Sequence, residues 1–116
     1  MTILFLDGAD SYNTTAINRK WTSSLNATIG AFGRRNTQGV RATTSGYVAK
    51  GFTSISTFVI GCAFRTNSLV QTTIIRMLDG ATAQCSLVLQ TNGRLAVYRG
   101  TTTTLLGETT TSVISP

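Results

Sequence analysis

The side chains that could carry out chemistry in this chain are few, and their spacing matches no common active site. The 116 residues include four acidic side chains, two cysteines and no histidine. Two carboxylates about 5 to 10 Å apart can hydrolyse a glycosidic bond, and carboxylate oxygens also bind calcium. Asp7, Asp10 and Asp79 are the candidates for these chemistries. Because Asp7 and Asp10 lie in a turn-rich segment, we expect them to accept hydrogen bonds from the backbone.

Other common reactions lack a necessary residue. A serine-type nucleophile needs a base beside it, and the two lysines, Lys20 and Lys50, do not lie in a Ser-x-x-Lys arrangement. The cysteines provide too few ligands for zinc. The glycine-rich segment 30–33 lacks the lysine of a phosphate-binding loop. We therefore expect a protein that is not an enzyme and that holds no metal or cofactor.

Basic residues are the other chemically distinctive group. Ten basic and four acidic residues give a formal net charge of +6, which favours anionic partners such as acidic protein faces, phosphate polymers or lipopolysaccharide. The alternative is that the charge serves solubility alone. Two basic doublets are the candidates for a partner-binding surface: Arg19, Lys20, Arg34 and Arg35.

Aromatic side chains lie beside both doublets, Trp21 after the first and Phe32 before the second. Stacking platforms next to cations bind single-stranded nucleic acid. A single tryptophan in a β-rich domain is more often part of the core, and no run of five or six like charges marks a nucleic-acid-binding arm. We therefore do not expect nucleic acid as a partner.

Cys62 and Cys85 each lie in an apolar run, segments 58–64 and 85–89. We expect both to be reduced thiols buried in the core, where cysteine behaves as a small apolar residue; one disulfide between them is the alternative. The apolar stretch at the N-terminus is too short for a signal peptide, and no segment has the length of a membrane span. These features predict a protein that is made and retained in a cytoplasm, or that is assembled there into something larger.

The elements that would position these residues are strands. Threonine, valine and isoleucine favour strand geometry, and eleven glycines at short intervals predict many short strands separated by turns. The length allows a single domain over residues 1–116. We predict an all-β fold.

The clearest predicted element is a hairpin. Strands 85–90 and 94–99 flank Asn92-Gly93, a pair that favours a two-residue type I′ turn. Leu95 and Val97 are predicted to face the core, with Tyr98 on the opposite face.

Short alternating segments predict further strands. One of them, segment 57–65, is apolar on both faces, which is typical of a central strand. One helical turn is predicted near Ala16 to Trp21. The predicted strands outside the hairpin are 3–6, 29–32, 39–42, 57–65, 72–78, 102–106 and 109–114.

The order of several motifs resembles the concanavalin A-like (laminin G-like) jelly-roll domains of tailed-phage virion proteins. These motifs are Phe5-Leu6-Asp7-Gly8-Ala9-Asp10-Ser11-Tyr12, Lys20-Trp21, Gly33-Arg34-Arg35 with Gly39-Val40-Arg41, the apolar segment 58–64, Leu78-Asp79-Gly80, Leu87-Val88-Leu89, Asn92-Gly93 and the segment 95–100. The resemblance implies an antiparallel two-sheet jelly-roll sandwich. Members of that family usually continue with further strands, so it also implies a sandwich that is small, incomplete, or completed by a neighbouring subunit, and sheet edges that pair with another chain.

Two functions are consistent with this resemblance. The first is a non-enzymatic phage virion protein, a capsid decoration or cement subunit present as a homo-oligomer or in many copies, which binds the major capsid protein or tail proteins. The alternative is a carbohydrate-binding tail adhesin that recognises the host. Its candidate glycan-binding residues are Trp21, Asp79, Asn92 and Tyr98. A hydrolase remnant that depends on Asp79 is the least favoured reading.

Overall fold

Antiparallel strands dominate the protein. The computed structural model describes residues 9, 12–33, 37–53, 57 and 59–114, and 46% of the described residues lie in strands that form two antiparallel sheets. The predicted all-β class is therefore confirmed. The chain divides into two compact units, residues 1–58 and 59–116, and each is described by itself. The predicted strand over residues 3–6 lies outside the described residues.

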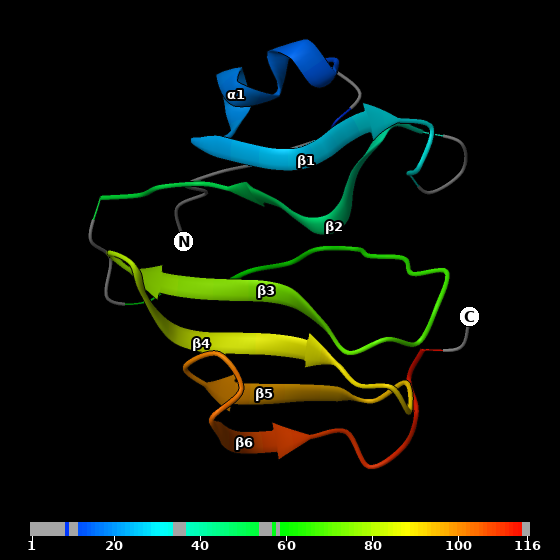
Figure 1. Cartoon of the computed structure of the whole chain (residues 1–116), viewed down its shortest axis with the longest axis vertical. Helices are drawn as coiled ribbons and strands as arrows, with labels where there is room; N and C mark the ends of the chain where they lie inside the picture. Colours follow the sequence, from blue (N-terminus) through cyan, green and yellow to red (C-terminus); the bar gives the residue numbers. More distant parts are fainter. Residues whose placement is uncertain (1–8, 10–11, 34–36, 54–56, 58, 115–116) are drawn as a thin grey trace. The chain divides into compact units, whose positions relative to one another are not determined.

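The first unit contains a two-stranded ribbon. Strand β1 (Ser23–Gly30) pairs with β2 (Gly39–Ala49), with Ser23 opposite Ala49 at one end and Gly30 opposite Gly39 at the other (Figure 1). Both strands are longer than the predicted segments 29–32 and 39–42. The additional positions mix serine and threonine with apolar residues such as Leu25 and Val48, and they show no clear alternation for the sequence pattern to detect.

The ribbon is interrupted where Asn26 of β1 faces residues 43–46 of β2. Asn26 and Ser45 both have positive φ angles, 45° and 56°. A Cβ atom at Gly46 would lie 2.7 Å from the Asn26 carbonyl oxygen. The bulge therefore depends on a glycine at position 46, because any side chain there would push the two strands apart.

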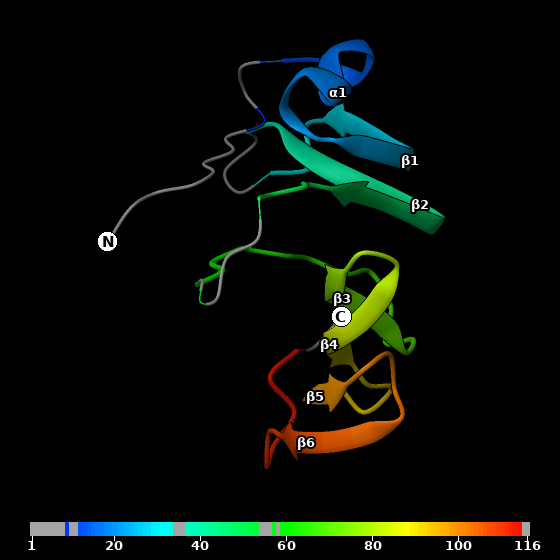
Figure 2. The ribbon, with the colours of Figure 1, turned by 90° about the vertical axis from the view of Figure 1, so that its left-hand side faces the viewer.

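A short helical segment precedes the ribbon, as predicted. A 3₁₀ turn, η2 (Thr14–Ala16), leads directly into α1 (Ile17–Lys20). Figure 2 shows this segment on one side of the paired strands β1 and β2. Ile17 is its buried residue.

The second unit is a four-stranded antiparallel sheet in the order β3-β4-β5-β6 (Figure 1). Its strands are β3 (Thr72–Asp79), β4 (Thr82–Leu89), β5 (Leu95–Arg99) and β6 (Thr104–Glu108). The predicted strand over 72–78 and the hairpin that follows it are confirmed.

Both faces of the hairpin are partly buried, so the predicted core face is only half of the result. On the predicted face Leu89, which pairs with Leu95, is 2% exposed, whereas Leu95 and Val97 are half-buried. On the opposite face Ser86, Val88 and Ala96 are 0 to 1% exposed. The Ser86 hydroxyl donates a hydrogen bond to the Gly100 carbonyl at 2.7 Å. This bond satisfies the one polar side chain among these three and allows its burial.

The hairpin loop also differs from the prediction. The Gly93 N–H donates to the Gln90 carbonyl at 3.0 Å, and the Gln90 N–H donates to the Arg94 carbonyl at 2.8 Å. The loop therefore has three residues, 91–93, and only Gly93 has a positive φ, of 77°. This is the hairpin in which a turn is followed by a glycine in the left-handed region. The register is the reason: Leu89 pairs with Leu95, which leaves one residue too many for a two-residue turn.

Two predicted strands are wrong. Residues 59–65 form no strand, and Val59 is 79% exposed. Cys62 is exposed and Cys85 half-buried, although both thiols are free as expected. An apolar segment becomes a central strand only where two neighbours pair with it, and the described residues offer this segment neither.

The second wrong prediction is the strand over residues 109–114. The predicted strand 102–106 corresponds to β6, but residues 109–114 form no strand. The backbone N–H groups of Val113 and Ile114 both donate to the Gly93 carbonyl, at 3.0 and 3.2 Å. The Thr109 hydroxyl accepts from the Leu95 N–H at 3.2 Å. This segment therefore turns back over the hairpin loop and does not extend the sheet.

Replacing Gly93 by alanine should destabilise the protein. Alanine would have to adopt a positive φ, and its Cβ would collide with the Ser112 hydroxyl and the Ile114 carbonyl. We expect Gly93→Ala to lower the free energy of unfolding by about 1 to 3 kcal/mol, measured by urea denaturation. Gly61→Ala is the matched control, since a Cβ there meets nothing within 4 Å. Equal stability of the two variants would show that the loop is not held in this conformation.

Candidate functional site

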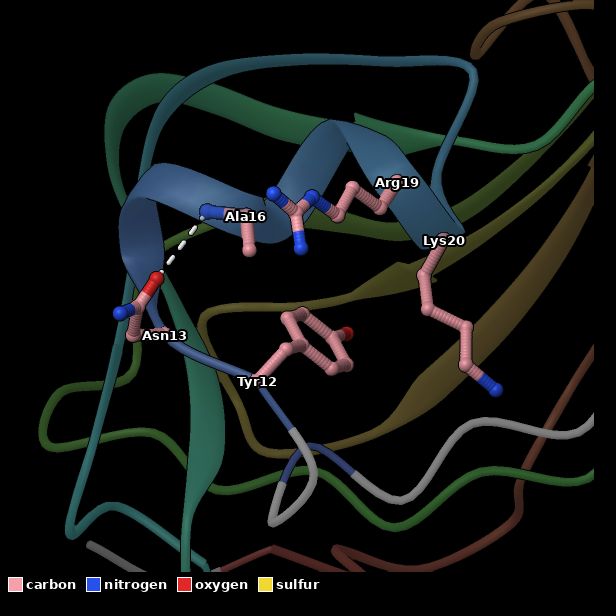
Figure 3. Close-up of a pocket in the computed structure, with 5 residues that line it drawn as sticks. All are labelled: Tyr12, Asn13, Ala16, Arg19 and Lys20. Atoms are coloured by element: carbon pink, nitrogen blue, oxygen red, sulfur yellow. Dashed lines mark hydrogen bonds between the residues drawn. The ribbon is translucent and has the colours of Figure 1, made fainter.

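An open hollow beside α1 contains two of the predicted partner-binding residues. Its volume is about 420 Å³, which is within the usual range for small-ligand sites. The residues that line it are Tyr12, Asn13, Ala16, Arg19 and Lys20 (Figure 3). Residues 1–58 carry six of the basic side chains and two of the acidic ones, a formal net charge of +4. The hollow is therefore in the more cationic part of the chain.

The local sequence explains why a helical segment forms here. Asn13 is the N-cap of η2, and its side-chain oxygen accepts hydrogen bonds from the Ala16 N–H at 3.1 Å and the Thr15 hydroxyl at 2.7 Å. Asparagine is among the preferred N-cap residues. At the other end, the Trp21 N–H donates to the Ile17 carbonyl at 3.0 Å. Trp21 itself has extended backbone geometry, which ends the helix.

So short a helix is not stable by itself, and side chains attach it to the ribbon. The Ile29 N–H donates to the Thr14 hydroxyl at 2.8 Å. The Ser24 hydroxyl donates to the Asn18 side-chain oxygen at 2.9 Å. These bonds hold both the 3₁₀ turn and the helix against β1. The hollow is thus fixed by the fold of the first unit.

The Lys50 side chain contacts the backbone at the end of α1. The Lys50 ammonium group donates to the Lys20 carbonyl oxygen at 2.8 Å. A cation near the carbonyl end of a helix is favourable, because that end carries partial negative charge. The interaction places the positive charge of Lys50 close to α1, in addition to those of Arg19 and Lys20.

Tyr12 supplies an aromatic surface between the two lining cations. Figure 3 shows its ring below α1, with the Arg19 guanidinium above it and the Lys20 side chain to one side. The Tyr12 hydroxyl accepts a hydrogen bond from the Trp21 indole N–H at 2.9 Å. Because this bond fixes the ring, the hollow presents two positive charges around a rigid aromatic surface. Such an arrangement can bind a carboxylate or another anionic group.

The candidate residues of the predicted surfaces are not all brought together. Arg19 and Lys20 line the hollow, whereas Arg34 and Arg35 lie outside the described residues. Trp21 belongs to the first unit, and the other three glycan-binding candidates, Asp79, Asn92 and Tyr98, belong to the second.

Within the second unit these three candidates are also dispersed. Asp79 pairs with Thr82 at the start of β4, whereas Asn92 is in the loop beyond its far end. The eight residues of β4 separate them by roughly 25 Å at about 3.4 Å per residue. The Tyr98 hydroxyl accepts a hydrogen bond from the Gln90 side-chain amide at 2.8 Å. The four candidates therefore do not form one glycan site.

Sequence reasoning missed Tyr12 and Asn13 as lining residues. The sequence contains a signal for Asn13, since asparagine followed by Thr14-Thr15-Ala16 is typical of a helix start. Nothing in the sequence pattern indicates that Tyr12 would lie against α1. Its position depends on the contact with Trp21.

The described residues offer little other chemistry. No group of three or more His, Cys, Asp or Glu side chains among them could hold a metal ion, and Asp7 and Asp10 lie outside them. Within the same described part, no helix has both the length and the apolar character needed to cross a membrane.

Large apolar side chains, in contrast, are widely exposed. The exposed ones among the described residues are Leu25, Phe32, Tyr47, Phe52, Val59, Ile60, Phe64, Val70, Leu78, Leu105, Leu106 and Val113. Those buried are fewer and mostly smaller: Ala9, Ile17, Val88, Leu89 and Ala96.

The chain was compared with family models, with curated proteins and with solved structures, and none of them matches it.

Removing the Tyr12 hydroxyl should loosen the hollow. In Tyr12→Phe the indole N–H loses its acceptor, and we expect a loss of about 1 kcal/mol in the free energy of unfolding. The emission of Trp21, the one tryptophan, should shift to longer wavelength as water contacts the indole. The exposed Tyr47 provides the control, Tyr47→Phe. Identical emission spectra for wild type and Tyr12→Phe would contradict the Trp21–Tyr12 contact.

Proposed function

We propose that the chain is a non-enzymatic structural protein of a bacteriophage virion, a capsid decoration or cement subunit that stabilises the particle by binding neighbouring virion proteins. The observation that carries this proposal is the excess of exposed over buried large apolar side chains in the described residues. Exposed apolar side chains that gather into a contiguous patch mark an interaction surface, and in this proposal those of each unit form such patches. A protein that functions inside an assembly has that surface covered by its neighbours.

The fold supports the same conclusion. A two-stranded ribbon such as β1-β2 is marginally stable by itself, so the first unit gains from any additional packing partner. Its finer architecture is part of the proposal: a concanavalin A-like jelly-roll sandwich over residues 1–116, whose sheets are completed by a neighbouring subunit. Interfaces of standard size bury about 1,600 Å², and many copies on one particle would add their effects through avidity.

The hollow beside α1 supplies the electrostatic part of the contact. Arg19 is exposed and Lys20 is half-buried, so both can meet acidic side chains of a capsid or tail protein. Charge complementarity of this kind sets orientation and association rate more than affinity. The apolar surface would supply most of the affinity.

The carbohydrate-binding alternative has less support. Within the second unit its candidates Asp79 and Asn92 lie at opposite ends of β4. The Trp21 indole, the most plausible sugar platform, is half-buried and hydrogen-bonded to Tyr12.

Rebinding to particles tests the proposal. A phage that encodes the chain is grown with the gene deleted, and purified protein is added to its virions. We expect saturable binding and a higher melting temperature of the particles. Absence of binding at every salt concentration would refute the proposal.

A charge-reversal variant tests the α1 face. Arg19→Glu/Lys20→Glu should weaken particle binding roughly tenfold or more and remove most of its dependence on ionic strength. Arg65→Glu/Arg76→Glu is the matched control, because it makes the same change in net charge at exposed arginines of the second unit. Equal losses in the two variants would mean that only net charge matters and that α1 is not the contact.

A further inference from the structure

Strand β6 is an uncovered edge of the four-stranded sheet. Within the described part of the chain it pairs with β5 alone, and all five of its residues are exposed. A Cβ atom at Gly107 would meet nothing within 4 Å. The outer side of β6 therefore presents backbone N–H and C=O groups that a further strand could pair with.

A bulge interrupts this edge strand at two leucines. Leu105 pairs with Tyr98 and Gly107 with Val97, which leaves Leu106 as the additional residue. Two residues of a bulged strand face one residue of its neighbour, so Leu105 and Leu106 together lie opposite Tyr98. They are 53% and 54% exposed. The edge thus combines open backbone groups with two adjacent exposed leucines.

The charge of β6 distinguishes it from the opposite edge. Glu108 is its one ionisable residue, and its carboxylate forms an ion pair with the Arg94 guanidinium at 2.7 Å. Strand β3, at the other edge, carries Arg76 in its middle and Asp79 at its end. In a protein of net charge +6, β6 is the edge where two copies can approach without opposing like charges.

We propose that β6 pairs with β6 of a second copy of this chain, antiparallel and about a two-fold axis perpendicular to the sheet. This axis keeps equivalent faces on the same side, so Leu106, the middle residue of β6, lies beside Leu106 of the second copy. The two Glu108 side chains lie at opposite ends of the pair. The arrangement is self-complementary and closes after two copies. It goes beyond the proposed function and does not require a virion partner.

The size of this contact sets its strength. A strand of five residues buries less than the roughly 1,200 Å² typical of stable complexes. We therefore expect a dimer of roughly micromolar affinity in solution, with a larger effect where many copies are held close together on an assembly.

Sedimentation of the full chain over roughly 1 to 500 µM tests the pairing, a range that covers micromolar affinities. Wild type should change from monomer to dimer, and Leu106→Lys should shift the midpoint at least tenfold to higher concentration. Leu78→Lys is the control, because Leu78 is an equally exposed leucine on β3. Circular dichroism verifies that both variants fold.

A disulfide trap gives a second readout that does not depend on weakening the contact. In a Cys62→Ser background, which removes the exposed native thiol, Leu106→Cys should give covalent dimers on mild oxidation and Leu78→Cys should not. A monomer at all concentrations, or dimers trapped equally by both variants, would overturn the proposal. Growth into open polymers that Leu78→Lys abolishes would do the same, since it would place β6 against β3 of the next copy. None of these outcomes affects particle binding through the α1 face, so the two proposals fail separately.

Discussion

The antiparallel pairing of β4 with β5 is the interaction on which the second unit depends. Leu89 faces Leu95, Val88 faces Ala96 and Ser86 faces Tyr98 across this ladder. The most completely buried side chains of the unit belong to these two strands. The bond from the Ser86 hydroxyl to the Gly100 carbonyl removes the cost of burying a polar group among them. Strands β3 and β6 extend this pair outward, and burial falls off toward both edges.

The first unit has only two strands with which to bury side chains. Its ribbon cannot bury much on two strands, so hydrogen bonds from threonine, serine and asparagine side chains attach α1 to β1. Polar side chains thereby stabilise a contact that apolar packing stabilises in larger sheets. One consequence is a rigid, cationic hollow on the surface. Another is that apolar residues such as Leu25 and Tyr47 remain exposed on the strands themselves.

Both units therefore combine defined backbone pairing with surfaces that water does not favour. Apolar surface that a chain does not cover itself is available to a neighbour, and an unpaired strand edge offers directional hydrogen bonds in addition. The two proposals depend on different features, cationic side chains beside α1 for the first and open backbone groups along β6 for the second.

The sequence alone determined the class of the fold and several of its elements. Threonine and β-branched residues predicted strands, Asp79-Gly80 marked the turn after β3, and Asn92-Gly93 located the hairpin correctly. These signals are local, since they depend on the backbone preferences of neighbouring residues. The Arg19-Lys20 doublet was likewise visible as a charge feature, and the helical turn that carries it was predicted.

Only the tertiary structure decided which face of a strand is buried and which apolar segment finds a partner. Alternation in the hairpin predicted one core face, but Leu89 is buried on that face while Ser86, Val88 and Ala96 are buried on the other. The segment 59–65 has the composition of a central strand but pairs with nothing in the described chain. Tyr12 joined Arg19 and Lys20 through a hydrogen bond with Trp21, nine residues away. Register, pairing and such contacts depend on residues distant in the sequence, and for that reason local pattern could not supply them.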